Sequence, residues 1–172
     1  MKRTGLILAA ALLLAPAFLP KALVAPLGAA APGAALSPVE QAAAFRGAGF
    51  LMVRGKWQAC GDPGTESYMP GTIEAVRDLN GDGLPEAVII EGSGFCFGAA
   101  GTGYWLMSQR PDQTWKVMSR GQGIVQVLPT RGAAKWPDIE IGGPGFCFQV
   151  LRWNGRAYVH NRYQYEGRAC RP

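Results

Sequence analysis

The sequence has few of the residues from which metal centres and common active sites are built. It contains one histidine, His160, and four cysteines, no two of which are spaced as Cys-x-x-Cys. Zinc needs four nitrogen, sulfur or oxygen ligands at workable spacing, so a zinc site is excluded. Neither a Gly-Lys-Ser/Thr phosphate motif nor a Gly-x-Ser-x-Gly hydrolase motif occurs. The chain therefore offers no recognisable catalytic centre.

Excess charge of one sign is also lacking once the N-terminal segment is set aside. The formal net charge of +5 includes Lys2, Arg3 and Lys21, whereas all acidic residues come later in the chain. Without these three, the 17 basic residues fall to 14, against 12 acidic residues. Net charge thus gives no reason to expect nucleic-acid binding.

No apolar run is long enough for a comfortable membrane span, which needs roughly 20 residues. Lys2 and Arg3 precede an uncharged run, Leu6 to Leu19, which is the pattern of a secretory signal peptide. Cleavage could follow Ala15-Pro16-Ala17 or fall between Gly28 and Ala35. We expect residues 1–36 to be a signal peptide and an Ala/Pro-rich linker, and the mature protein to be periplasmic or secreted without a membrane span. A retained N-terminal anchor is the alternative.

Residues 37–172 are predicted to form one domain that begins with a helix. Ser37, Pro38 and Glu40 have the spacing of a capping box with proline at the first helical position, and Gly47 to Gly49 end the helix after Arg46. Val39, Ala43 and Phe45 are expected to face the core. A hairpin over residues 50–60 should follow, turning at Arg54-Gly55.

The rest of the domain is predicted to be strands and turns in two similar units. A proline, an acid, an apolar strand, a glycine-rich turn and Phe-Cys-Phe recur in order from Pro85 to Phe97 and from Pro137 to Phe148. Each unit then ends in a hairpin, with turns at residues 110–113 and at Asn154-Gly155. We expect a mostly β fold, all-β or α+β, with an N-terminal helix. Two duplicated units, over about 72–120 and 124–165, would give about four strands each and pack as a small sandwich or as twisted sheets.

Four cysteines behind a signal peptide predict two disulfides. Of the three possible pairings, the duplication favours Cys96 with Cys147 near a pseudo-twofold axis, which leaves Cys60 to pair with Cys170.

The alternation of acids and isoleucines in Asp138-Ile139-Glu140-Ile141 predicts a strand with its isoleucines turned inward and its acids turned to water.

An acidic loop precedes the first apolar strand. Oxygen-bearing side chains at alternate positions, followed by glycine, suit a hard cation such as calcium. Ile89 stands where an EF-hand has its bidentate glutamate, and Pro85 disfavours a following helix. A turn without metal is the alternative interpretation. The predicted ligands of one weak calcium site are Asp78, Asn80, Asp82, Leu84 and Glu86.

The same loop carries a resemblance. Asp-x-Asn-x-Asp-Gly-x-x-Glu leading into an apolar strand resembles the calcium loop of FG-GAP/VCBS-type repeats. The stretch from Gln41 to Arg171 resembles a family of small secreted bacterial proteins with no assigned activity. The residues that carry this second resemblance are Cys60 to Gly64, Arg77 to Glu86, Trp136 to Phe148 and Arg152 to Gly155. Both resemblances imply export, β structure and one ion site. Arg131 to Lys135 occupy the equivalent loop of the second unit, so only one site is expected.

The C-terminal segment interleaves basic and aromatic residues. One interpretation is a stacking surface for a ligand, formed by Trp153, Tyr158, Arg156 and Arg162. The other interpretation is an ordinary amphipathic hairpin with aromatic residues in the core.

Together these features favour an exported, non-enzymatic binding or structural module whose partner is an envelope polysaccharide or protein. An inhibitor of an envelope hydrolase such as lysozyme is the first alternative, with the loop over residues 61–71 as the inhibitory segment. A hydrolase is the second alternative, and it needs two carboxylates facing each other across a cleft. Its candidate acids are Glu86, Glu91 and Glu140.

Overall fold

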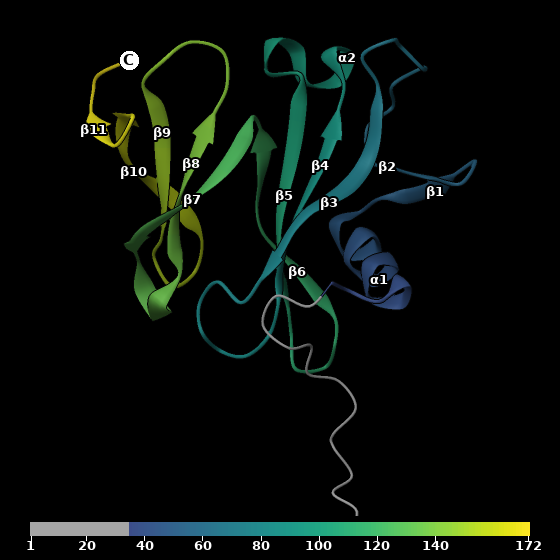
Figure 1. Ribbon diagram of the computed structural model, residues 1–172, viewed down its shortest axis with the longest axis horizontal. Helices are drawn as coiled ribbons and strands as arrows, with labels where there is room; N and C mark the ends of the chain where they lie inside the picture. Colours follow the sequence, from purple (N-terminus) through teal and green to yellow (C-terminus); the bar gives the residue numbers. More distant parts are fainter. Residues whose placement is uncertain (1–34) are drawn as a thin grey trace, which may run out of the picture.

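The computed structural model describes residues 35–172, so the predicted signal peptide and linker over residues 1–36 lie outside the described residues apart from positions 35 and 36. This part of the chain is mostly β, as predicted, and consistent with a small sandwich (Figure 1). The elements in chain order are α1 (Pro38–Ala48), β1 (Leu51–Val53), β2 (Lys56–Gln58), β3 (Met69–Arg77), β4 (Glu86–Gly92), α2 (Gly94–Phe97), β5 (Thr102–Gln109), β6 (Trp115–Gln122), β7 (Ile124–Arg131), β8 (Pro137–Gly142), β9 (Phe148–Trp153), β10 (Tyr158–Tyr165) and β11 (Arg168–Ala169).

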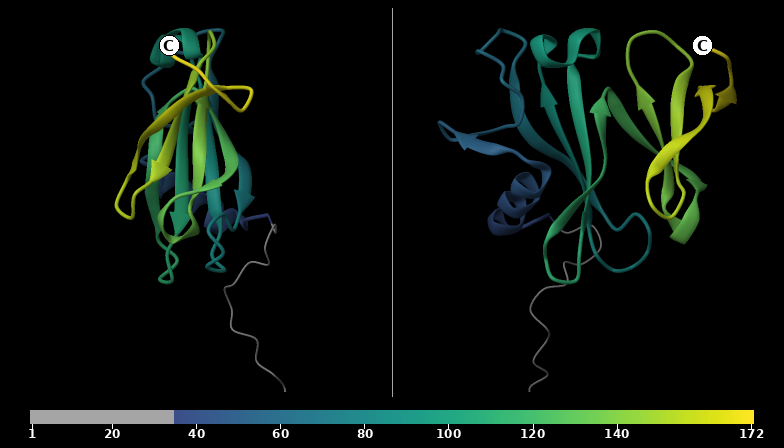
Figure 2. Two further views of the ribbon diagram at one scale, coloured as in Figure 1. Left: turned by 90° about the vertical axis from the view of Figure 1, so that its left-hand side faces the viewer. Right: turned by 180° about the vertical axis from the view of Figure 1, so that it is seen from behind.

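The strands form two antiparallel sheets and a separate hairpin. The first sheet has the order β3-β4-β5-β6, the second has the order β11-β10-β9-β8-β7, and within residues 35–172 β1 pairs only with β2. Figure 2 shows the second sheet on one side of the first, with α1 and the hairpin on the other. The first sheet is therefore the middle layer of three.

Burial on both faces of the first sheet explains its uninterrupted apolar runs. Along β4, Ala87 and Ile89 pack toward α1, whereas Val88 packs toward the second sheet. Successive side chains of a strand point to opposite faces, so a strand covered on both sides needs apolar residues at every position. The core consequently consists of two clusters that lie on either side of the first sheet.

The predicted capping box is present at the start of α1, whereas the helix ends at Ala48, two residues later than predicted. The Ser37 hydroxyl accepts a hydrogen bond from the Glu40 N–H, the Glu40 carboxylate accepts one from the Ser37 N–H, and Gly49 adopts the left-handed conformation that ends the helix. Phe45 is buried as predicted. Val39 was expected in the core, but its side chain is 78% exposed because it lies on the helix face turned away from the sheet.

Two further predictions were wrong. The disulfides join Cys60 to Cys96 and Cys147 to Cys170, so Cys96 and Cys147 do not meet. Each Phe-Cys-Phe motif is tied to a neighbouring segment at its own side of the molecule. Asp138 and Glu140 do not face water but are buried, because side chains from β9 and β10 cover them.

Candidate functional site

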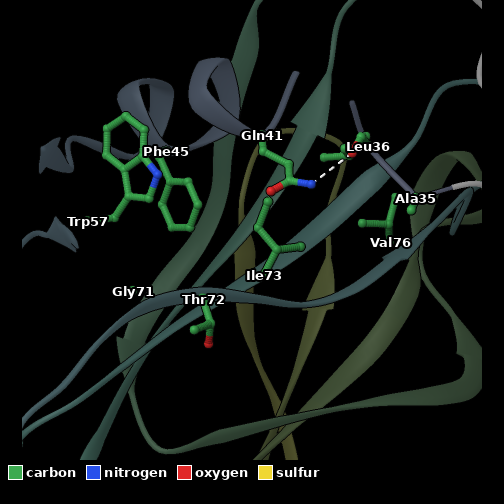
Figure 3. Close-up of a pocket in the computed structure, with 9 residues that line it drawn as sticks. All are labelled: Ala35, Leu36, Gln41, Phe45, Trp57, Gly71, Thr72, Ile73 and Val76. Carbon is green, nitrogen blue, oxygen red and sulfur yellow. Dashed lines mark hydrogen bonds between the residues drawn. The ribbon is translucent and has the colours of Figure 1, made fainter. Parts of the chain in front are cut away.

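A groove of about 420 Å³ runs between α1 and the edge strand β3, and we call it the α1–β3 groove (Figure 3). Trp57 of β2 lies at one end, and Leu36, just before α1, lies at the other. The edge position of β3 leaves this side of the first sheet open to the groove. The groove is lined by Ala35, Leu36, Gln41, Phe45, Trp57, Gly71, Thr72, Ile73 and Val76.

A column of aromatic rings leads from the groove into the core. The rings of Trp57 and Phe45 are stacked, with centroids 4.9 Å apart and planes 11° from parallel. Phe45 contacts Phe50 edge-on at 5.3 Å, and Phe50 contacts Trp105 in the same manner at 4.7 Å. Because large aromatic side chains dominate the energetics of cores and interfaces, this column both fixes α1 and presents an apolar surface in the groove.

Gly71 allows β3 to lie close to this column. A Cβ atom at position 71 would overlap the Phe50 ring and would lie 3.1 Å from Cε1 of Phe45. Glycine within a strand often marks such a close approach. The narrow spacing of α1 and β3 therefore depends on the absence of a side chain here.

The lining of the groove suits binding better than catalysis. None of its nine residues is charged, and the polar side chains are those of Gln41 and Thr72. The Gln41 amide donates a hydrogen bond of 2.8 Å to the Leu36 carbonyl, which holds the segment before α1 in place. An apolar concavity with a few polar groups is typical of a ligand site. A general acid or base needs a titratable side chain within reach, and the lining provides none.

Four of the five predicted calcium ligands lie in the loop between β3 and β4, and the side chains of three of them hydrogen-bond to the loop itself. Asp78 accepts hydrogen bonds from the N–H groups of Gly81 and Gly83, at 2.7 and 2.9 Å. Asn80 accepts one from the Asp82 N–H, and Asp82 accepts one from the Leu84 N–H. Among residues 35–172 no group of three His, Cys, Asp or Glu side chains is gathered so that it could hold a metal ion. The calcium site stays a prediction.

Glu86 is the first residue of β4, and it is buried against this loop. Its carboxylate accepts hydrogen bonds from the Leu79 N–H at 2.7 Å and from the Ser108 hydroxyl at 2.9 Å. Burial, only partly offset by these two hydrogen bonds, raises the pKa of Glu86 to about 7, and the nearby charges of Asp82 and Asp78 act in the same direction. In this arrangement Glu86 is occupied with protein groups rather than directed at a cation.

The candidate hydrolase acids lie apart from the groove. Glu91 is fully buried and accepts hydrogen bonds from the N–H groups of Ala59 and Cys60 and from the Tyr68 hydroxyl. Burial and the Glu91 carboxylate raise the pKa of Tyr68 to about 12. Glu86 and Glu140 are also buried, and neither lines the α1–β3 groove. Each carboxylate thus has a structural role that accounts for its burial.

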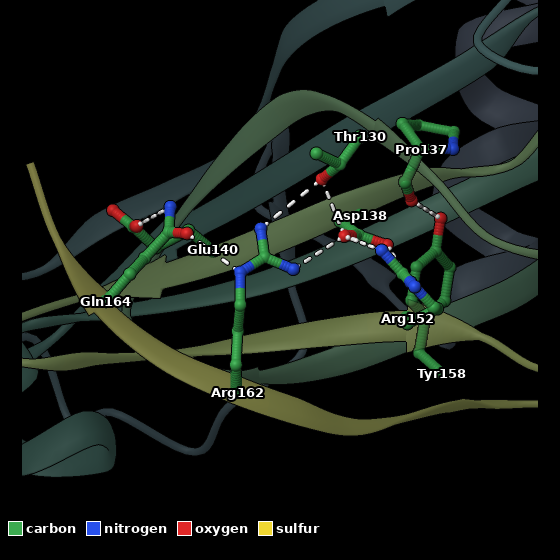
Figure 4. Close-up of polar contacts among 8 residues, drawn as sticks. All are labelled: Thr130, Pro137, Asp138, Glu140, Arg152, Tyr158, Arg162 and Gln164. Atoms are coloured by element: carbon green, nitrogen blue, oxygen red, sulfur yellow. Dashed lines mark hydrogen bonds and ion pairs between the residues drawn. The ribbon is translucent and has the colours of Figure 1, made fainter. Parts of the chain in front are cut away.

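Asp138 is the centre of a polar network on the second sheet (Figure 4). Its carboxylate accepts two hydrogen bonds of 2.9 Å from Arg152, one of 2.8 Å from Arg162 and one of 2.6 Å from Thr130. Burial opposes ionisation, but these donors prevail and hold the pKa of Asp138 well below its usual range. The network continues from Arg162 to Gln164, which donates to Glu140 at 2.7 Å.

The predicted C-terminal ligand surface does not come together. Trp153 is buried, and its ring contacts Tyr158 at 5.4 Å. The Tyr158 hydroxyl donates a hydrogen bond to the Pro137 carbonyl, and Arg162 belongs to the Asp138 network. Of the four predicted residues only Arg156 is classed as exposed. The amphipathic-hairpin interpretation describes this segment better than a stacking surface.

The two Phe-Cys-Phe motifs lie at the same end of the molecule, in α2 and in the connection between β8 and β9 (Figure 1). The first phenylalanine of each is largely exposed, Phe95 at 67% and Phe146 at 74%. The adjacent cysteines, Cys96 and Cys147, both form disulfides, so each exposed phenylalanine belongs to a segment that a disulfide holds in place. No charged residue occurs in residues 92–103 or 142–150.

Comparison with known proteins adds no relative from which a function could be transferred. No protein-family model, curated protein or solved structure matches the chain. In the described residues, no helix has the length and apolar character needed to cross a bilayer. Two disulfides are typical of a protein that folds in an oxidising environment.

Sequence reasoning missed the α1–β3 groove because its lining comes from three separate segments. Phe45 was expected to serve the core only, and Trp57 was placed in the hairpin without any further role. One signal was present, since Gly71 interrupts an otherwise strand-like stretch and such glycines mark close approaches. Nothing in the local sequence, however, says which side chains Gly71 approaches.

Proposed function

We propose that the protein is an exported, non-enzymatic binding module that acts in the cell envelope or outside the cell, and that the α1–β3 groove is its binding site. The observation that carries this proposal is the groove itself, an apolar concavity with an aromatic column and no charged lining residue. Export is supported by the signal-peptide pattern from Lys2 to Leu19 and by the two disulfides.

The test is binding of an uncharged apolar fluorescent dye, Nile red, to the purified mature protein. Trp57→Ala removes half of the Phe45–Trp57 stack and should weaken dye binding roughly tenfold, the loss expected for about 1.4 kcal/mol of apolar contact. Lys56→Ala is the matched control, because Lys56 neighbours Trp57 in β2 but does not line the groove. Equal dye affinity in wild type and Trp57→Ala would contradict a binding site here.

Inhibition of an envelope hydrolase is the second candidate function, and one observation favours it. Phe95 and Phe146 project from two uncharged, disulfide-braced segments at one end of the molecule, where they could enter the cleft of an enzyme. The Phe95 segment adjoins the predicted inhibitory loop over residues 61–71, because the Gly94 N–H donates a hydrogen bond to the Ser67 hydroxyl and Cys60, just before the loop, is joined to Cys96.

A lysozyme assay at micromolar protein tests this candidate. The Phe95→Ser/Phe146→Ser double variant should lose the inhibition that wild type shows. Val39→Ser serves as the control, because Val39 is an equally exposed apolar residue on α1. Inhibition that is absent in wild type, or unchanged in the double variant, rejects the candidate.

A further inference from the structure

The α1–β3 groove borders a strand that is paired along one edge within residues 35–172. Among the described residues β3 pairs with β4 alone and ends the order of the first sheet. Gly71, Thr72, Ile73 and Val76 of β3 line the groove, so the edge strand itself forms one wall of the apolar lining (Figure 3). An edge strand displays a row of N–H and C=O groups that can pair with another backbone.

We propose that the ligand of this groove is an extended, uncharged polypeptide segment that adds to β3 as an additional antiparallel or parallel strand. This inference rests on the proposed binding function of the groove and specifies its ligand. Only another extended backbone offers donors and acceptors at the spacing that β3 presents, which is the basis of recognition by strand addition. A glycan would need more polar lining groups than Gln41 and Thr72 provide.

The lining defines the chemistry of the segment. Alternate residues of an added strand point to the same face, so every second side chain would enter the groove beside α1. The stacked rings of Phe45 and Trp57 offer these side chains an apolar surface. Because no lining residue is charged, a charged side chain would lose its hydration without gaining a partner. The segment is therefore apolar at every second position and uncharged on the groove side.

The irregularity of β3 limits the length of the ligand. Its pairing with β4 shifts register between Met69 and Thr72 and again between Ile73 and Ala75. Bulges of this kind protect an edge against open-ended pairing with other sheets. The geometry thus favours a short segment over continuous sheet extension by a second copy of this protein.

Selection from a phage-displayed random-peptide library tests the proposal. The disulfide-intact wild-type protein is the target, and Trp57→Ala and Lys56→Ala are counter-targets. Peptides with alternating apolar and uncharged polar residues should be enriched on wild type and on Lys56→Ala, but not on Trp57→Ala. Lack of enrichment on a wild-type protein that still binds the dye would overturn strand addition while leaving the groove as a binding site.

A selected peptide is then synthesised with N-methyl groups on either set of alternate residues. Strand addition uses the N–H groups of one set only, so methylation of that set should weaken binding roughly tenfold and methylation of the other set should not. In ¹⁵N-labelled protein the amide signals of residues 71–76 should shift on binding. Equal binding of both methylated forms overturns the proposal, as does a wild-type dimer that the peptide cannot dissociate.

Discussion

At the scale of single residues, Asp138 shows how an acid can replace an apolar residue inside a β protein. The alternating pattern of this strand correctly predicted that Ile139 is buried. The same pattern wrongly predicted that Asp138 faces water. The partners Arg152 and Arg162 come 14 and 24 residues later in the chain, so no local pattern reveals them. A buried carboxylate that is paired and hydrogen-bonded makes the fold sensitive to mutation of either partner. Removal of one partner leaves the charge of the other buried without a counter-charge, which is strongly destabilising.

Asp138→Asn should therefore lower the free energy of unfolding by about 2–4 kcal/mol at pH 7, somewhat less than for a fully buried pair because both arginines reach water. The folded-state pKa of Asp138 is lowered, so its contribution is present above about pH 4 and is lost as the pH falls through the folded pKa. The difference between wild type and variant should shrink from pH 7 to pH 3 in urea denaturation. Glu74→Gln, on the exposed side of β3, is the control. A difference that stays constant with pH would contradict this role.

At the scale of elements, the sequence predicts best what is decided within a few neighbouring residues. The capping box of α1 and the turns at residues 54–55, 110–113 and 154–155 were all placed correctly, because each depends on contacts between adjacent positions. The edge position of β7 in the second sheet was not predicted, and neither was the groove. Both depend on how segments far apart in the chain pack together, which local periodicity does not encode.

The loop between β3 and β4 is the element whose prediction can be tested most directly. If Asp78, Asn80 and Asp82 bind calcium, titration calorimetry should give a dissociation constant of about 10⁻⁴–10⁻³ M, and millimolar calcium should raise the melting temperature. Asp82→Asn should weaken binding roughly tenfold, since the loss of ligand charge lowers affinity in such loops. Asp112→Asn removes the same charge from the turn between β5 and β6 and should have no effect. Absence of heat and of thermal stabilisation would leave the loop as a hydrogen-bonded turn.

At the scale of the whole molecule, the disulfides do not join the two sheets. Cys60–Cys96 ties the segment after β2 to α2, and Cys147–Cys170 ties the connection after β8 to the C-terminal segment. The sheets are held together instead by the apolar cluster that includes Leu106 and Ile139. The two sheets therefore keep their arrangement through packing, while Cys60–Cys96 ties the hairpin side to the first sheet and Cys147–Cys170 constrains one end of the second sheet.

Peptide mapping of the non-reduced protein should yield Cys60–Cys96 and Cys147–Cys170 as linked pairs, and a Cys96–Cys147 peptide would contradict the structure. The separations of 36 and 23 residues predict a loss of about 3–4 kcal/mol of stability when either pair is replaced by serine.

The two serine variants should differ in dye binding. Cys147→Ser/Cys170→Ser leaves the α1–β3 groove untouched and should bind the dye normally. Cys60→Ser/Cys96→Ser frees the segment that follows Trp57, so it should weaken dye binding, and equal binding by both variants would show that the groove does not depend on this anchor.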